Sequence, residues 1–451
     1  MPDDFADLWA FVTGLLRRIS PGGSLDRHWL AQERNRFKNL WEVARQQAEY
    51  DPRPPAGELA GYLNAARLAS AEHPYPAILP GTVLPPLSQV YVRQQAQLQQ
   101  AGESGKSLNK TAWDRRPAED IIQGTVPMTW LLGGPGAGKS SLLRMIVIRL
   151  ARELLSGGGK KPLPRRSTHP GVIQTTSSKD DEPRARPLFP VYVPAQALTQ
   201  PGSFTQQLAH AVAAQLKGYD YVPPSDRLFR GPPLPGAQWL ILIDGLDEIS
   251  DVDERLRVLK TLMANKKYCY RFVIGSRPLP DSELAILDEA VDPAREESGS
   301  AGRYELLPLD VSVLPTFVRG WMDAAHVPEP APAVAAFMYQ VNGGRLRELV
   351  RIPLMATILC QLHAADPTHP LPTGRYTAYQ RFYELLCDRF YDPSTTGINH
   401  QLHTQLQRYG AQSSAAIDSL PNRLLTALGQ VAFGGEASAP VAVRWSRSGR
   451  A

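Results

Sequence analysis

A glycine-rich stretch between two apolar segments constrains the fold of this chain more than any other feature. MTWLLGGPGAGKSSLLRMIVIRLARELL, residues 128–155, reads as an apolar strand, a glycine-rich turn and a long helix. The turn GGPGAGKSS, residues 133–141, fits the pattern G-x-x-x-x-G-K-[ST]. Glycines here let successive backbone N–H groups face inward around a phosphate, and the following helix adds the positive end of its dipole. The pattern therefore predicts a phosphate-binding loop between a strand and a helix.

Each part of this loop has an expected task. Lys139 is expected to reach the β- and γ-phosphates of a nucleotide, and the Ser140 hydroxyl is expected to ligate Mg²⁺. The alternative is a glycine-rich turn with no ligand, but the flanking strand and helix favour the phosphate loop. The candidate phosphate-binding residues are Gly133, Gly134, Pro135, Gly136, Ala137, Gly138, Lys139, Ser140 and Ser141.

Three carboxylates follow a second apolar run, WLILIDGLDEIS, residues 239–250. Asp244, Asp247 and Glu248 raise one another's pKa at such spacing, so a nearby cation is expected. A strand that ends in Asp is typical of a Walker B element, and we expect Asp244 to hold Mg²⁺ through water at the carboxyl edge of the sheet. Either Asp247 or Glu248 would activate the attacking water, with Glu248 preferred. The alternative is a charged turn that caps the next helix.

Strands and helices alternate through the middle of the chain. Expected strands cover residues 128–134, 188–195, 239–244, 271–276 and 304–309, and expected helices cover 138–156, 203–217, 252–265 and 281–290. This order indicates βαβ units and a parallel sheet covered on both faces, hence a three-layer αβα sandwich. After residue 310 the pattern is helical, with helices expected at 312–325, 331–341, 345–364, 374–391 and from about 422.

Composition excludes several other classes of protein. A net charge of +5 on 49 basic and 44 acidic residues gives no strong nucleic-acid signal. Three widely spaced cysteines (Cys269, Cys360 and Cys387) argue against a disulfide framework and favour a reducing, cytoplasmic setting. The apolar run LWAFVTGLL, residues 8–16, is too short for a membrane span, and the acidic start lacks the basic region of a signal peptide.

The nucleotide base is expected to be adenine. GTP-binding proteins use an N-K-x-D loop, and the nearest stretch here, NKKY at residues 265–268, lacks the final Asp. This stretch also precedes a predicted strand, where the GTP-binding loop would follow one. ATP and ADP with Mg²⁺ are therefore the expected ligands.

The chain resembles the NACHT group within the STAND class of P-loop NTPases. The matching stretches are WLILIDGLDEI (239–249), GSRP (275–278), LPLDVSVLPTFVRGWM (307–322), NGGRLRELVRIPLMATILC (342–360) and TAYQRFYELLCDRF (377–390). The resemblance implies that Arg277 senses the γ-phosphate. It also implies that Pro353 packs on the nucleotide base.

The resemblance, over about residues 125–435, implies an NTPase domain, a helical subdomain and a winged helix in that order, and the residue patterns outside it and within the NTPase domain add three further segments. A helical adaptor or oligomerisation region (1–72) and a proline-rich linker that wraps the NTPase (73–127) are expected before the NTPase domain (128–310). The NTPase domain is expected to contain a mobile insertion (157–187). A helical subdomain (311–372) and the start of a winged-helix region (373–451), expected to be incomplete, would follow.

Proteins of this family act as switches, so the same is expected here. ADP holds a closed monomer, and ATP allows an open form that forms homo-oligomers and clusters an effector, with slow hydrolysis between the two. Bacterial members are similar to anti-phage proteins of innate immunity, in which an unknown protein trigger or effector would be the partner. Two other classes stay open: an ATPase machine similar to AAA+ proteins, and a nucleotide-regulated DNA-binding regulator.

Overall fold

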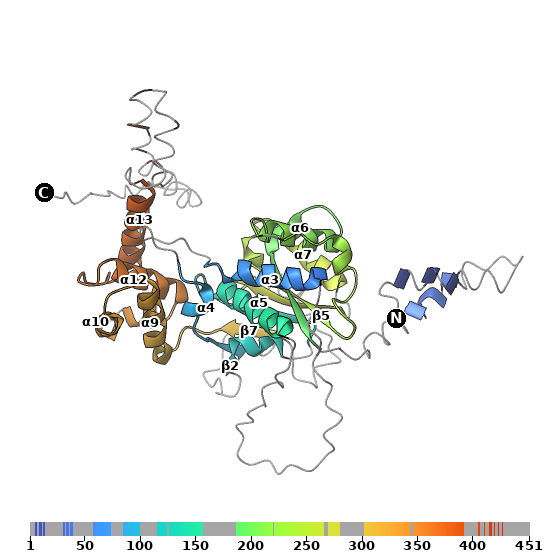
Figure 1. Ribbon diagram of the computed structural model, residues 1–451, viewed down its shortest axis with the longest axis horizontal. Coiled ribbons are helices and arrows are strands. Elements are labelled where there is room, and N and C mark those ends of the chain that lie inside the picture. The colour runs from blue at the N-terminus through green and yellow to red at the C-terminus, as the bar shows by residue number, and fades with distance from the viewer. Residues whose placement is uncertain are drawn as a thin grey trace, which may run out of the picture. The chain divides into compact units, whose positions relative to one another are not determined.

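The computed structural model describes residues 57–73, 84–99, 115–123, 126–156, 186–219, 221–265, 269–279, 302–342 and 346–391, with isolated residues outside these ranges. The chain forms two compact units, one of residues 1–76 and 84–371 and the other of residues 77–83 and 372–451. No helix in the described part is long and apolar enough to cross a membrane. The first unit contains the sheet and the phosphate loop (Figure 1).

Seven strands form one sheet in the order β2-β1-β7-β3-β6-β5-β4. Their bounds are β1 Gln95–Leu98, β2 Arg115–Pro117, β3 Met128–Leu132, β4 Leu188–Pro194, β5 Gln238–Asp244, β6 Tyr270–Ser276 and β7 Gly302–Leu306. The five strands from β7 to β4 are parallel, whereas β1 is antiparallel to both β7 and β2. This is the α/β architecture of a P-loop NTPase, as expected, with an antiparallel pair added at one edge.

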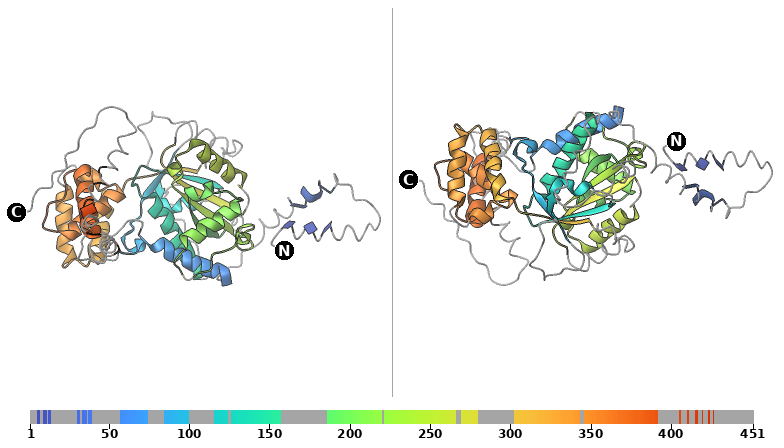
Figure 2. Two further views of the ribbon diagram at one scale, coloured as in Figure 1. Left: turned by 90° about the horizontal axis from the view of Figure 1, so that it is seen from above. Right: turned by 90° about the horizontal axis from the view of Figure 1, so that it is seen from below.

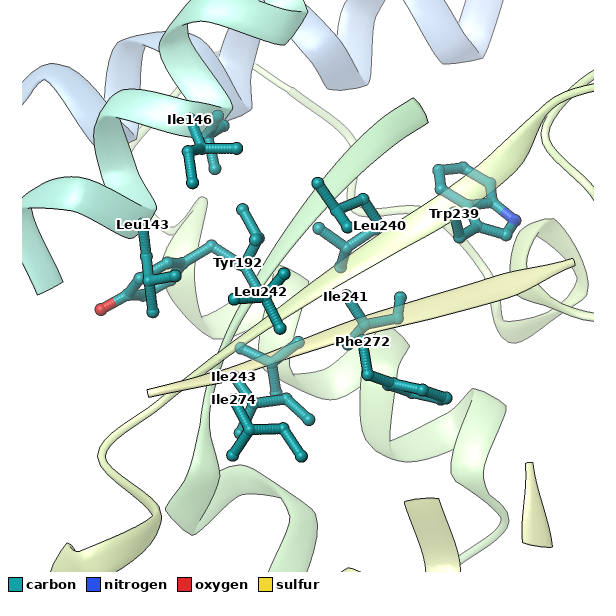
Figure 3. Packing of buried hydrophobic residues seen from close by; sticks show 14 of the residues in the cluster. Leu143, Ile146, Tyr192, Trp239, Leu240, Ile241, Leu242, Ile243, Phe272 and Ile274 are labelled. Atoms are coloured by element: carbon teal, nitrogen blue, oxygen red, sulfur yellow. The ribbon is translucent and has the colours of Figure 1, made fainter. Parts of the chain in front are cut away.

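The sheet is buried on both faces, which explains its uninterrupted apolar strands. Five consecutive side chains of β5, Trp239 to Ile243, have no exposed surface (Figure 3). Phe272 of β6 packs on Phe204, whereas a side chain at Gly275, three residues later and therefore on the opposite face, would meet Leu143. Burial of each large apolar side chain contributes about 1.5–3 kcal/mol, so β5 is a rigid base for the acidic residues that follow it.

Helices cover the two faces (Figures 1 and 2). Helix α5, Lys139–Leu155, packs with α3, Gly57–Ala71, on one face. Helices α6, Phe204–Gln215, and α7, Val252–Ala264, lie on the other. Helix α6 begins with a capping box between Ser203 and Gln206, and the Asp251 side chain caps α7. The three layers agree with the expected sandwich.

The segment expected to be a linker, 73–127, contributes secondary structure to this domain. It contains α4, Leu87–Val90, the strands β1 and β2, and a short 3-10 helix, Ala118–Ile122. The sheet is therefore mixed rather than wholly parallel. Helix α3, which was expected in a separate N-terminal region, also belongs here, because the Tyr62 hydroxyl donates to the Pro190 carbonyl at 2.9 Å.

Two strands end earlier than expected, one at a glycine and one near a proline. Strand β3 ends at Leu132, before the expected 134, because the glycine loop begins with Gly133, whose N–H donates to the Ser276 carbonyl at 3.2 Å. Strand β7 ends at Leu306, before the expected 309, and Pro308 has no N–H for a strand ladder.

Helices follow the sheet within the same unit. They are α9, Leu314–Ala324, α10, Pro330–Asn342, α11, Leu346–Leu349, and α12, Pro353–Ala365. The single helix expected over 345–364 is wrong: α11 and α12 are separate. Pro353 forces the preceding Ile352 into an extended conformation (φ −90°, ψ 115°) and occupies the first turn of α12.

The second unit contains α13, Arg375–Tyr391, close to the expected 374–391. Several other predictions fall outside the described residues. These are the helix at 281–290, the insertion at 157–187 except for its last two residues, most of the helical region before residue 57, the helix from about 422, and the winged-helix region after residue 391.

Candidate functional site

The glycine loop joins β3 to α5 at the carboxyl end of the parallel strands. Gly136 (φ 72°) and Gly138 (φ 95°) both adopt the left-handed region, which side chains rarely enter, so glycine is required at both positions. Gly134 and Pro135 are exposed at the tip of the loop. The Lys139 ammonium folds back over the loop and donates to the Gly133 carbonyl at 2.7 Å. Ser140 and Ser141 follow in the first turn of α5, where its free N–H groups lie.

Asp244 is the last residue of β5 and is held by the neighbouring strand. Its Oδ2 atom accepts a hydrogen bond of 2.6 Å from the Tyr192 hydroxyl of β4. Its Oδ1 atom lies beside Gly275, where an added Cβ would stand 3.5 Å away. The glycine leaves space at this oxygen.

Asp247 is paired with Arg277, the residue directly after β6. The Arg277 N–H donates to Asp247 Oδ1 at 2.9 Å, and its Nε atom lies 3.0 Å from Oδ2. The Asp247 side chain is 17% exposed, whereas that of Arg277 is 56% exposed. The pair leaves more than half of the Arg277 side chain exposed at the rim of the site.

Glu248 differs from Asp247 in its surroundings. Its carboxyl group packs over Gly245, where an added Cβ would lie 2.7 Å from the carboxyl carbon. Burial raises the pKa of Glu248, and the charges of Asp244 and Asp247 raise it further. Within the described part of the chain, no other side chain forms a hydrogen bond or ion pair with this carboxylate. Its lone pairs therefore remain available.

Lys139 lies close enough to the acidic residues for their charges to act on its pKa. Burial lowers the pKa of the Lys139 ammonium. Three carboxylates act on this pKa in the opposite direction, those of Asp247, Asp244 and Glu248. The structure therefore brings the loop lysine and the acidic cluster together, although they are far apart in the chain.

The start of α12 contacts the loop directly. The Leu354 N–H donates to the Gly136 carbonyl at 3.1 Å, and an added Cβ at Gly136 would lie only 2.7 Å from the Leu354 Cβ. An added Cβ at Gly138 would lie 3.3 Å from Pro353. The hydrogen bond from the Leu354 N–H satisfies one of the N–H groups that an α-helix leaves without a partner in its first turn.

A small cavity of about 40 Å³ lies beside this contact. Its lining includes Pro353, the residue expected at the base, together with Val90, Tyr91, Gly138, Ser141 and Phe317. Apolar and aromatic side chains are typical of a nucleobase pocket. Pro353 thus lines a small cavity that also borders the loop residue Gly138, and its packing on a base stays a prediction.

Gln94 is a site residue that the sequence did not indicate. It is 4% exposed, and its amide donates to the Ala137 carbonyl at 3.0 Å and to the Leu307 carbonyl at 3.2 Å. It supports the loop from a segment expected to be a linker, so no pattern marked it. Tyr192 was also missed. The sequence did offer a signal: its hydroxyl group is carried near the carboxyl end of a predicted strand, and that strand precedes the Asp244 strand in the chain.

The residues present fit a magnesium ion. Mg²⁺ prefers oxygen ligands and is usually held by one or two carboxylates together with substrate phosphates and water. Asp244 and Ser140 supply one carboxylate and one hydroxyl, and Gly275 leaves space beside Asp244 Oδ1. Among the described residues there is no group of three or more His, Cys, Asp or Glu side chains that could hold a metal without a substrate.

Comparison with known protein families gives one similarity. The family model described as "Nephrocystin 3, N-terminal" matches residues 112–277, a range that begins just before β2 and ends at Arg277. The matched region is therefore similar to a NACHT-related N-terminal region. A comparison with curated proteins finds no match.

Several solved structures are similar to this chain. The Orc1 protein of Aeropyrum pernix in complex with DNA has 14% sequence identity and a TM-score of 0.30, over 71% of this chain and 76% of that one. A Walker-type ATPase of Pyrococcus abyssi has 14% identity and a TM-score of 0.32, over 64% and 74%. The Hsp104–ADP complex of S. cerevisiae has 13% identity and a TM-score of 0.32, over 68% and 38%. The sheet order, the glycine loop and the family match over residues 112–277 together indicate the fold of a P-loop NTPase.

Proposed function

We propose that this protein is an ATP-dependent conformational switch of the NACHT type, which binds ATP and ADP and hydrolyses ATP slowly. The observation that carries the proposal is the hydrogen bond from the Leu354 N–H to the Gly136 carbonyl. It makes the phosphate loop a docking surface for the helices that follow the sheet. A change at the phosphates therefore reaches the first turn of α12 directly.

Charges around the loop support nucleotide binding. Lys139 would neutralise the β- and γ-phosphates, and Ser140 and Asp244 would hold Mg²⁺, which when bound neutralises further phosphate charge. The cavity next to Pro353 is smaller than a nucleobase, so it would have to widen to take the base. Binding would also replace the hydrogen bond from Lys139 to the Gly133 carbonyl.

For hydrolysis, Asp247 and Glu248 would have different tasks. Asp247 is already bound to Arg277, so its role is to position that guanidinium at the rim of the site. Glu248 has a raised pKa and available lone pairs, so it would accept the proton of the attacking water. Arg277 would contact the γ-phosphate through the exposed part of its guanidinium.

The switch itself requires a difference in affinity. ATP and ADP can change the arrangement of α12 on the loop only if they bind the two arrangements with different free energies. ADP would favour the docked arrangement described here. ATP would favour a released arrangement that forms homo-oligomers and recruits an effector.

The mass distribution of the purified chain tests the proposal. We expect monomers with ADP and larger species with a slowly hydrolysed ATP analogue, together with slow steady-state ATP turnover. The same mass with both nucleotides would contradict the switch. Rapid turnover by a stable ring would instead favour a continuously working ATPase machine.

A role in bacterial innate immunity belongs to the same proposal. Phage challenge of cells that carry the wild type or Lys139→Ala would test it.

A further inference from the structure

Tyr192 connects the strand at the sheet edge to the acidic residue at the end of the next strand. Strand β4 pairs with β5 in parallel, with Pro194 opposite Asp244 and Tyr192 opposite Leu242. From this position the Tyr192 hydroxyl reaches forward and donates to Asp244 Oδ2 at 2.6 Å. Figure 3 shows the ring directed away from the strand, with its hydroxyl at the tip. A short hydrogen bond to a charged carboxylate belongs to the stronger class of hydrogen bonds in proteins.

We propose that Tyr192 is a positioning residue for the magnesium site: it holds Asp244 by one oxygen so that the other oxygen faces the metal. The proposal rests on the proposed function, because it assumes that Asp244 serves a nucleotide-bound Mg²⁺. It adds a residue outside both nucleotide motifs to the site.

The two oxygens of Asp244 have different surroundings. Oδ2 accepts from the Tyr192 hydroxyl, whereas Oδ1 lies beside Gly275 and accepts no hydrogen bond from the described residues. The terminal torsion of an aspartate is broad, so the carboxylate would rotate freely without an anchor. One hydrogen bond selects an orientation in which Oδ1 is available. Partners of this kind are typical of carboxylates that hold metals.

Tyr192 is itself held in place. Its side chain is 7% exposed, and the Arg144 guanidinium lies over its ring, 5.5 Å from the centroid. Arg144 belongs to α5 and stands one turn after Ser140, on the same side of that helix. It is fixed in turn by a hydrogen bond of 3.1 Å to the Glu72 carbonyl at the end of α3. The anchor of Asp244 is therefore rigid.

The proton of the hydrogen bond has a fixed place. An ionised carboxylate has no proton to give, so the Tyr192 hydroxyl is the donor and Asp244 Oδ2 the acceptor. A phenylalanine at this position would keep the ring and its contact with Arg144 but remove the anchor.

A competing explanation is that Tyr192 is only a packed residue whose hydroxyl needs a partner. The two explanations differ in their dependence on metal. A packing defect would weaken nucleotide binding equally with and without Mg²⁺. Loss of the anchor would weaken only the binding that depends on the metal.

The test uses the full chain with Tyr192→Phe. Tyr221→Phe is the matched control, because Tyr221 is a tyrosine bonded to the Glu58 carbonyl and outside the site. Calorimetry measures ADP affinity in EDTA and in a Mg²⁺ titration, and electron paramagnetic resonance measures Mn²⁺ bound with ADP. We expect unchanged affinity in EDTA and about tenfold more Mg²⁺ for half-maximal binding in Tyr192→Phe, as is typical when a ligand's partner is removed.

A double-mutant cycle with Asp244→Asn keeps the test specific. Tyr192→Phe should add nothing to the metal dependence once Asp244→Asn has removed the carboxylate that Tyr192 holds. The proposal would be overturned if ADP binding by the wild type and by Tyr192→Phe depended equally on Mg²⁺. It would also be overturned if Tyr192→Phe lost as much ADP affinity in EDTA as in Mg²⁺.

If Tyr192→Phe fails to fold, the same Mn²⁺ spectra are measured for Arg144→Met, which removes the guanidinium from the Tyr192 ring. A spectrum identical to that of the wild type would overturn the proposal. A wild type that binds no nucleotide would instead overturn the proposed function itself.

Discussion

The carboxylate of Asp247 binds both the backbone N–H and the side chain of Arg277, at 2.9 and 3.0 Å. It thereby links the residues that follow β5 to the end of β6, the strand that separates β5 from β3 in the sheet. Both oxygens of Asp247 are therefore engaged by Arg277, which supports the proposal that Asp247 positions the arginine and that Glu248 accepts a proton.

The Asp247–Arg277 pair should determine how well the site distinguishes ATP from ADP. Arg277→Ala should lower the preference for ATP by about tenfold, since a hydrogen bond to a charged group contributes about 1.5–3 kcal/mol. Asp247→Asn should lower it in the same direction by releasing the guanidinium. Calorimetry with both nucleotides would measure the ratio. The double variant should be no worse than Arg277→Ala; additive losses would show that the two residues act independently.

Glu248→Gln should slow ATP hydrolysis while nucleotide affinity is kept. Glutamine preserves the shape of the side chain but cannot accept the proton of the attacking water, and loss of a general base typically costs about 10²–10⁴-fold in rate. Single-turnover hydrolysis would measure the rate, and calorimetry the affinity. Wild-type turnover in this variant would remove Glu248 from the mechanism.

The same substitution should stabilise the protein at neutral pH. The pKa of Glu248 is raised in the folded state, so the folded protein disfavours its charged form. Above both the unfolded and the folded pKa this costs stability, and below both it costs none. The melting temperature of Glu248→Gln should therefore exceed that of the wild type at pH 7.5. The difference should shrink as the pH falls through the raised pKa of Glu248 and should be absent below the ordinary glutamate pKa of about 4.3. A constant difference across this range would contradict the assignment.

Lys139→Ala should abolish binding of ATP, because no other lysine lies in the phosphate loop. Lys260→Ala is a suitable control, since Lys260 is an exposed residue of α7. Calorimetry would compare ATP affinity in the two variants. Unchanged affinity in Lys139→Ala would count against the assignment of the loop.

Gly136→Ala should loosen α12 from the loop. The left-handed conformation at Gly136 costs a residue with a side chain about 1–2 kcal/mol, and the new methyl group would collide with Leu354. Gly134→Ala is the matched control, because nothing lies within 4 Å of the added atom and its φ is not in the left-handed region. Thermal melts and hydrogen exchange at α12 would separate the two variants. The penalty of Gly136→Ala should shrink in a Leu354→Ala background; an unchanged penalty would show that the contact is not its cause.

Local motifs were predictable from the sequence because short stretches determine their geometry. The glycine loop and the acidic end of β5 each need only a strand, a turn and the residues in the turn. The short, polar strands β1 and β2 show no apolar alternation, so the segment 73–127 looked like a linker. The proline at 353 was visible, but the helix pattern on both sides of it concealed the break.

Contacts between distant segments were not predictable. Tyr192 reaches Asp244 only because β4 pairs with β5, and Gln94 reaches the loop only because β1 joins the sheet beside β7. Neither strand order nor register can be read from a single sequence of alternating strands and helices. The surroundings of Asp247 and Glu248 likewise became distinct only once the end of β6 was placed beside them.

The bond between Gly136 and Leu354 has a mechanical consequence. Any rotation of α12 about its first turn must break or bend this hydrogen bond, so Gly136 would be the pivot if the helices move. A ligand that changes the conformation of the Gly136 peptide would act directly on the first turn of α12. No relay across the sheet would then be needed between a bound phosphate and α12.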